Sequence, residues 1–176
     1  MIFTETPLAG AFVMALEPRD DERGFFARAF CQNELAEHGL ETTVAQANLS
    51  FNHRKGTLRG LHMQNPPHGE DKMVRCITGA IYDAIVDLRP GSPTYRQWFG
   101  VELSAANRLM LYVPKGFAHG YQSLSDGSEV LYMVTQFYTP GAERGLRWND
   151  PAFGIAWPLP DPILSEKDAA APDFTP

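Results

Sequence analysis

The stretch Val130-Leu131-Tyr132-Met133-Val134-Thr135-Gln136-Phe137-Tyr138 is rich in β-branched and aromatic side chains, a composition typical of a β-strand. Because side chains alternate between the two faces of a strand, this run would present Tyr132, Gln136 and Tyr138 on one face. A face with two tyrosines and a glutamine fits the lining of a polar pocket. It also fits a partly solvated outer face, and this run alone favours the outer face.

Further strands are predicted on the N-terminal side of this run, at residues 73–77, 81–88, 98–103 and 108–113. The chain has fifteen glycines and fourteen prolines, which leave few places for helices of ordinary length. Two short helices are expected, one over residues 34–38 with Asn33 as its N-cap and Gly39 after its end, and one beginning at Ser165. Many short strands joined by turns predict an all-β sandwich or barrel.

The composition is that of one globular domain. The chain has 176 residues, of which 44% are hydrophobic and 20% charged, and no polar linker or repeat divides it. We therefore expect a single domain over residues 1–176.

Several classes of protein are disfavoured. A net charge of -6 disfavours nucleic-acid binding, which needs a basic surface. No stretch approaches the length that spans a membrane, and the first residues lack the pattern of a secretion signal, so a cytoplasmic protein without membrane contact is predicted. Cys31 and Cys76 form no CxxC pair, so neither a zinc ribbon nor a redox motif is indicated.

Positive charge is concentrated in one part of this acidic chain. If the fold brings this segment into a cavity, its side chains could bind a diphosphate, with arginine favoured for forked contacts. The alternative is a solvated basic edge strand. Between residues 51 and 76 the positive residues are Arg54, Lys55, Arg59, Lys72 and Arg75, against Glu70 and Asp71.

Two motifs resemble the halves of the signature of cupins, which are double-stranded β-helix (jelly-roll) barrels. His62 follows Gly56 after five residues, and Pro114-Lys115-Gly116-Phe117-Ala118-His119 matches the second half. Gln64 stands where cupins have a second histidine ligand, and Lys72 replaces the acidic ligand. Because an ammonium cannot coordinate a cation, the pattern predicts a metal-free cupin in which Lys72 could stabilise an oxyanion.

Six motifs are spread over nearly the whole chain. They are Asp21-Glu22-Arg23-Gly24-Phe25-Phe26, Thr57-Leu58-Arg59-Gly60-Leu61-His62-Met63-Gln64, Lys72-Met73-Val74-Arg75, Pro114-Lys115-Gly116-Phe117-Ala118-His119-Gly120, Trp148-Asn149-Asp150-Pro151 and Leu164-Ser165-Glu166-Lys167-Asp168. In their order and spacing these motifs resemble the dTDP-4-dehydrorhamnose 3,5-epimerase family.

The resemblance implies epimerisation of a nucleotide-linked 4-keto-6-deoxy sugar without cofactor or metal. It also implies a homodimer in which a strand of each subunit completes the site of the other. By resemblance, His62 is the general base, Asp168 holds it, and Tyr132 is the opposing general acid. The nucleotide and sugar site would be lined by Arg23, Gln46, Asn48, Arg59, Lys72, His119, Tyr138, Glu143 and Lys167.

This chemistry explains the residue types. The C4 keto group acidifies the hydrogens on C3 and C5, because loss of either proton leaves an enolate with its charge on oxygen. Inversion needs a base on one face of the sugar and an acid on the other. An imidazole is a base near neutrality, and a carboxylate at Asp168 would fix its tautomer. A buried ammonium at Lys72 would stabilise the enolate oxygen.

One departure from the family concerns the nucleotide base. Relatives commonly have Glu at the position of Arg28, in the nucleotide pocket. If Arg28 faces the base, the preference could change, because thymine presents an N3–H donor whereas cytosine presents an acceptor. A CDP-linked sugar is therefore an alternative substrate. The other interpretation is that Arg28 points outward.

Other functions stay open at the level of sequence. The same chemistry could invert only C3 or only C5. A noncatalytic cupin that binds a sugar nucleotide is a second alternative, and the combination of His62, Tyr132 and Asp168 argues against it. A metal-dependent cupin is a third, and Gln64 and Lys72 argue against it.

The family assignment also makes a geometric prediction. Strict alternation along a strand sends Arg59 and His62 to opposite faces, although both are assigned to one site. A bend or bulge is therefore required, and Gly60 is the obvious residue to form it.

Overall fold

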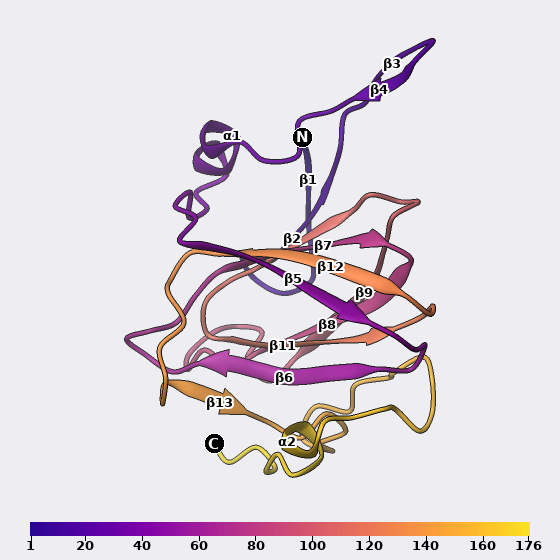
Figure 1. Ribbon diagram of the computed structural model, residues 1–176. Coiled ribbons are helices and arrows are strands. Elements are labelled where there is room, and N and C mark those ends of the chain that lie inside the picture. Colours follow the sequence, from indigo (N-terminus) through magenta and orange to yellow (C-terminus); the bar gives the residue numbers. More distant parts are fainter.

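Two antiparallel sheets face each other in the computed structural model, which describes residues 1–176 (Figure 1). One sheet has the strand order β1-β2-β10-β7-β12-β5 and the other β13-β6-β11-β8-β9. The strands are β1 Ile2–Glu5, β2 Phe12–Ala15, β3 Arg19–Asp21, β4 Gly24–Phe26, β5 Gln46–Asn52, β6 Leu58–Gln64, β7 Lys72–Thr78, β8 Ala80–Asp87, β9 Trp98–Ser104, β10 Met110–Val113, β11 Phe117–Ser123, β12 Ser128–Val134 and β13 Glu143–Gly145, and the helices are α1 Gln32–Glu37 and α2 Glu166–Ala169.

The strand pairing is nested. β8 pairs with β9, β7 with β10, β6 with β11 and β5 with β12, all antiparallel. A chain that doubles back at the β8–β9 turn and pairs outward in this way forms a jelly roll, and successive pairs fall on alternate sheets. The predicted all-β, double-stranded β-helix fold with short peripheral helices is confirmed.

The hydrophobic core lies between the inner faces of the two sheets. Val74 and Leu111 of the six-stranded sheet pack with Ile81 and Ile85 of the five-stranded sheet, and all four are fully buried. Burial of such apolar side chains is the main favourable term in folding. The core therefore fixes the position of the two sheets relative to each other, and polar side chains can line the space that remains between them.

The final predicted strand is shorter than its composition indicates. β12 ends at Val134, and the chain bends away from the sheet at Thr135 and Gln136. Phe137 and Tyr138 are consequently exposed. The prediction that Gln136 and Tyr138 continue the face of Tyr132 in one strand was therefore wrong.

The helix predictions had mixed outcomes. α1 begins after Cys31, so the predicted cap at Asn33 was wrong, and Gly39 follows the helix with the positive φ of +69° expected there. Ser165 caps α2 as predicted, and its hydroxyl accepts a hydrogen bond from the backbone N–H of Asp168 at 3.1 Å.

Gly60 forms the predicted bulge. In the β6–β11 ladder Arg59 pairs with Tyr121 and His62 with His119, so two residues of β6 oppose one of β11. Gly60 has a φ of +120°, and a Cβ there would lie 2.7 Å from the Cα of Gly120. Only glycine fits this close approach, and the extra residue turns Arg59 and His62 to the same face.

One hairpin stands away from the body. β3 and β4 pair only with each other and project beyond the sheets (Figure 1). All six of their residues are exposed, including Phe25 and Phe26.

Neither of the two helices is long and apolar enough to cross a membrane.

Candidate active site

Two adjoining hollows between the sheets share His62, Lys72 and Tyr132, and we call them together the active-site cavity. The first hollow has a volume of about 430 Å³ and the second about 310 Å³. The first is further lined by Gln46, Asn48, Met63, Gln64, Glu70, Val134, Tyr138 and Glu143, and the second by Ser50, Arg59, His119, Tyr121, Val130, Ser165, Lys167 and Asp168.

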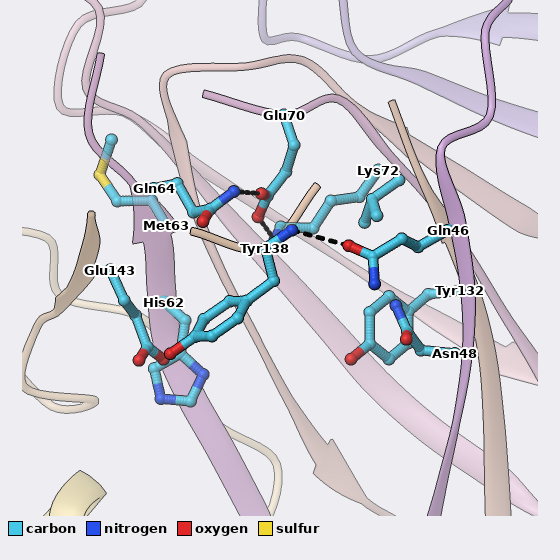
Figure 2. Close-up of a pocket in the computed structure, with 11 residues that line it drawn as sticks. Gln46, Asn48, His62, Met63, Gln64, Glu70, Lys72, Tyr132, Tyr138 and Glu143 are labelled. Atoms are coloured by element: carbon cyan, nitrogen blue, oxygen red, sulfur yellow. Dashed lines mark hydrogen bonds and ion pairs between the residues drawn. The ribbon is translucent and has the colours of Figure 1, made fainter. Parts of the chain in front are cut away.

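His62 and Tyr132 come from opposite walls of this cavity. His62 lies on β6 of the five-stranded sheet, and Tyr132 lies on β12 of the six-stranded sheet. Figure 2 shows them on opposite sides of the first hollow. A ligand held between them would meet an imidazole on one face and a phenol on the other.

His62 is bound to a buried carboxylate. Its Nε2 lies 2.6 Å from Oδ1 of Asp168, whose side chain is only 7% exposed. The Ser165 cap fixes α2, and the backbone bridge between Thr57 and Ile163 joins the segment before α2 to the start of β6. Since Nε2 is engaged by Asp168, Nδ1 is the nitrogen left to accept a proton.

The phenol of Tyr132 lines both hollows, where it can contact a ligand. Burial raises the pKa of Tyr132, with smaller contributions from Tyr121 and Glu70, while Arg59 opposes the rise. The phenol therefore keeps its proton at neutral pH, as an acid must.

Lys72 is paired with an acid that the sequence reasoning missed. Its ammonium contacts Glu70, and Glu70 also accepts from the side-chain amide of Gln64 (Figure 2). Gln64 is further held by the backbone of Thr139, which donates to its Oε1 at 2.7 Å. The position of a metal ligand in cupins thus belongs to an ion pair. No group of three or more His, Cys, Asp or Glu side chains is arranged to hold a metal.

Cations line the second hollow. Nε of Arg59 donates to Oδ1 of Asn52 at 3.0 Å, which orients the guanidinium beside the cavity. Nζ of Lys167 lies 2.5 Å from Oε2 of Glu143, and this contact raises the pKa of Lys167. Arginine and lysine held in this way offer donors to phosphate oxygens.

His119 faces His62 across the β6–β11 ladder and has its own carboxylate. Its Nε2 lies 2.9 Å from Oδ1 of Asp83, whose side chain is wholly buried. Burial raises the pKa of Asp83, and the nearby His119 and Lys72 oppose the rise. The cavity is therefore lined by two histidines that each contact an aspartate, and the sequence predicted one of these two pairs.

One end of the first hollow is formed by side chains of β5 and of the loop after β12. Oε1 of Gln46 accepts from the backbone N–H of Tyr138 at 2.7 Å, which anchors the loop after β12 against β5 (Figure 2). Asn48 lies two residues further along β5, where it is the cross-strand neighbour of Tyr132 in the same sheet. The exposed ring of Tyr138 thus stands at the mouth of the hollow although it is outside the strand predicted for it.

Arg23 and Arg28 are the predicted site residues that the chain does not bring to its own cavity. Arg23 is at the tip of the β3–β4 hairpin, where it pairs with Asp21. Nη1 of Arg28 lies 2.8 Å from Oε1 of Glu34, and Glu34 also binds the N-terminal amine. Within one chain, Arg28 is thus directed to α1 and away from the cavity.

Some residues in or behind the cavity wall had only weak signals in the sequence. Glu70 is an acid within a basic segment, and Asp83 is one of two acids, with Asp87, in the mostly apolar predicted strand 81–88. An ionisable residue in a buried strand is itself a functional signal. Ser50 and Tyr121, which hydrogen-bond to each other at 2.8 Å, had no distinguishing pattern.

Comparisons with known proteins agree with this geometry. The model of the dTDP-4-dehydrorhamnose 3,5-epimerase family matches residues 5–175. The chain belongs to this family. The dTDP-4-dehydrorhamnose 3,5-epimerase of Salmonella typhimurium is 47% identical over 164 residues, which are 91% of this chain and 89% of that protein.

Solved structures show the same fold. A Bacillus anthracis dTDP-4-dehydrorhamnose 3,5-epimerase with TDP and PPi bound superposes with a TM-score of 0.95 at 40% identity, covering 98% of this chain and 99% of that one. ChmJ, a 3'-monoepimerase from Streptomyces bikiniensis in complex with dTDP-quinovose, gives a TM-score of 0.87 at 34% identity, covering 96% and 85%. The predictions of a cupin-type epimerase and of an isomerase acting on a sugar nucleotide are confirmed.

Proposed function

We propose that this protein inverts C3 and C5 of dTDP-4-dehydro-6-deoxyglucose to give dTDP-4-dehydrorhamnose. The observation that carries the proposal is the placement of His62 and Tyr132 on opposite walls of one cavity. Inversion of a carbon requires a proton to leave one face and another to arrive at the opposite face. Two proton-transfer groups on a single wall could only exchange a proton with retention.

In the proposed mechanism, Nδ1 of His62 takes the proton from the carbon next to the C4 keto group. The electron pair of the broken C–H bond moves into the ring, and the C4 oxygen becomes an enolate oxygen. Asp168 stabilises the imidazolium that forms, since it already contacts Nε2. Tyr132 then delivers its proton from the other wall, and solvent restores both groups.

Lys72 is proposed to stabilise the enolate. It lines both hollows from β7, on the wall that also carries Tyr132. Because its ammonium is bound to Glu70, it is held in one place before substrate arrives. A fixed cation at a developing oxyanion stabilises the transition state more than the ground state.

Arg59, His119 and Lys167 are proposed to bind the diphosphate. All three line the second hollow. Gln46, Asn48, Tyr138 and Glu143 line the first hollow and would contact the sugar and the nucleotide base. The active-site cavity thereby offers positive charge to the anionic substrate, although the chain as a whole is acidic.

We favour inversion at both centres and a thymidine nucleotide. The 47% identical relative is named a 3,5-epimerase, whereas the named monoepimerase is 34% identical. The bound nucleotides in the related structures are TDP and dTDP-quinovose. Inversion of one centre, or a CDP-linked substrate recognised through Arg28, is the alternative that the experiment below separates.

We further propose a homodimer in which the β3–β4 hairpin reaches the partner's cavity. Phe26 is 73% exposed on this hairpin, and Leu49 and Phe51 are exposed on the outer face of the edge strand β5. Apolar side chains gathered on one projecting element and one sheet face are typical of a surface covered by another subunit. The dimer would bring Arg23 to a nucleotide site.

We also infer a cytoplasmic location, which is in keeping with unpaired Cys31 and Cys76.

The test is product analysis by NMR in deuterium oxide with dTDP-4-dehydro-6-deoxyglucose and its CDP counterpart. The proposal expects the dTDP substrate to gain deuterium at C3 and C5 and to give the rhamno-configured product. Deuterium at one centre would identify a monoepimerase, and faster turnover of the CDP sugar would reverse the base assignment. Binding without any exchange would identify a noncatalytic cupin and overturn the proposal.

A further inference from the structure

Asp83 is a buried carboxylate that the proposed reaction does not use. It lies on β8 between Ile81 and Ile85, which are core residues, and its own side chain is 0% exposed. Neither of its oxygens accepts a hydrogen bond. Its ion-pair partner is Nε2 of His119 at 2.9 Å, and the N–H bond of the ring is not directed along the line to the oxygen.

Such a carboxylate needs a cation beside it. An ionised carboxylate in an apolar interior without hydrogen bonds is strongly unfavourable unless a positive charge compensates it. Burial accordingly raises the pKa of Asp83, and His119 and Lys72 oppose this rise. Lys72 already contacts Glu70, so His119 is the group left to supply the compensating charge.

Three other groups that line the cavity are paired in the same way. Lys72 is paired with Glu70, Lys167 with Glu143 and His62 with Asp168, and Asp83 is the carboxylate of His119. Arg59 instead donates to Asn52 and to the carbonyl of Phe51. Arg59, Lys72 and Lys167 bring positive charge to the hollow that His119 lines. The ionisable groups that line the second hollow with it are Arg59 and His62 from β6, Lys72 from β7, Tyr121 from β11, Tyr132 from β12, and Lys167 and Asp168 from α2.

The buried nitrogen of His119 decides what the ring can offer a ligand. Nε2 is wholly buried beside Asp83, which leaves Nδ1 for the cavity. A neutral ring with its proton on Nε2 would present a lone pair to a phosphate oxygen and repel it. An imidazolium would present an N–H donor in a charge-assisted hydrogen bond.

We propose that Asp83 is a positioning residue for the substrate diphosphate, because it holds His119 as an imidazolium with Nδ1–H directed to the phosphate oxygens. The proposal rests on the proposed function, from which it takes the ligand and the role of His119. It extends that function by assigning a task to the buried acid behind the phosphate-binding wall.

The first test needs no variant of Asp83. The ¹⁵N chemical shifts of the ring nitrogens of His119 at pH 7.5 distinguish an imidazolium from either neutral tautomer, and the His119→Asn variant identifies the signals. The proposal expects both nitrogens to be protonated in the wild-type protein. A neutral ring, with its proton on either nitrogen, would overturn it.

The second test measures dTDP binding by calorimetry between pH 6 and 8.5. Asp83→Asn keeps the shape of the side chain and removes its charge, and we expect dTDP to bind about tenfold more weakly at pH 8 with a smaller loss at pH 6. Asp87→Asn, which changes another buried aspartate of β8, is the matched control and should leave binding unchanged. An equal affinity and pH profile for Asp83→Asn and wild type would contradict the proposal.

A double variant separates positioning from a general structural effect. Because Asp83 acts through His119, Asp83→Asn combined with His119→Asn should bind dTDP no more weakly than His119→Asn alone. Additive losses would contradict the proposal.

Epimerisation by the same wild-type preparation is measured in parallel. Without epimerisation the proposed function fails, whereas an active enzyme with a neutral His119 would refute only the role of Asp83.

Discussion

His62 and His119 lie opposite each other in the β6–β11 ladder, and each contacts an aspartate through Nε2, but the two pairs differ in their surroundings. His62 is one-third exposed, and its partner Asp168 belongs to the short helix α2 near the C-terminus. His119 is nearly covered, and Asp83 belongs to the core strand β8. The same chemical pair therefore serves two purposes. A base must gain and lose a proton in each turnover, whereas a binding group needs a constant charge.

The largest effect is expected from removing each of the two histidines in turn. His62→Ala should lower kcat by about 10³-fold, because it removes the group that takes the substrate proton. His119→Asn should instead raise KM with a small change in kcat, because it removes a contact made equally in ground and transition states. Steady-state kinetics of both variants check this difference. Similar losses of kcat in the two would mean that the pairs do not have separate roles.

A second prediction concerns the bulge that brings the two histidines to one face. Gly60→Ala should reduce the free energy of unfolding by about 3 kcal/mol, because its Cβ would collide with the backbone of Gly120 at a positive φ. Gly127→Ala is the control. Gly127 also has a positive φ, of +66°, but open space around it, so about 1 kcal/mol is expected. Urea unfolding measures both, and equal losses would show that the close approach at Gly60 is unimportant.

A third prediction separates the two aspartates. Asp168→Asn should lower kcat by about 100-fold and leave the Kd for dTDP unchanged, since Asp168 orients the base and stabilises its charged form. This is the reverse of the outcome expected for Asp83→Asn. If Asp168→Asn weakened dTDP binding and left kcat intact, the assignment of the catalytic pair would be wrong.

Asp87 provides a smaller test, on the same strand as Asp83. Both side chains are wholly buried, but burial of Asp87 is outweighed by hydrogen bonds from Arg89, Ser92 and Thr94, which lower its pKa to about 2. A carboxyl with a depressed pKa in the folded state stabilises the protein above its unfolded pKa of about 4, and this contribution is lost as pH falls from about 4 to 2.

Asp87→Asn should therefore destabilise the protein by about 2 kcal/mol at pH 7. The difference from wild type should shrink as the pH is lowered toward 2. Denaturant unfolding at a series of pH values measures this. A difference that stayed constant with pH would show that the hydrogen bonds of Asp87 do not depend on its charge.

These contrasts show why sequence reasoning reached part of the site. The motif around His62, the cap at Ser165 and the bulge at Gly60 depend on neighbouring residues, so they could be predicted. The end of β12 at Val134 could not, because no residue type in the following stretch marks the bend at Thr135 and Gln136. Composition alone favours a longer strand, and tertiary contacts override it.

The carboxylates that pair with the predicted cationic residues could not be predicted from the sequence either. Glu70, which neutralises Lys72, and Asp83, which faces His119, are recognisable only when the sheets are assembled. The charge concentrated between residues 51 and 76 fitted either a cavity for an anion or a solvated edge strand. It includes Arg54, Lys55 and Arg75, which do not line the active-site cavity. Which charges share a cavity is decided by the fold.

The central claim, that the proton leaves toward one wall and returns from the other, is tested most directly with Tyr132→Phe. In deuterium oxide with dTDP-4-dehydro-6-deoxyglucose, this variant keeps the base and loses the acid on the opposite wall. The account predicts that deuterium enters the sugar while the configuration is retained and the inverted product falls about 100-fold. Inversion at the wild-type rate would contradict it, and so would the loss of exchange in a folded variant that still binds dTDP.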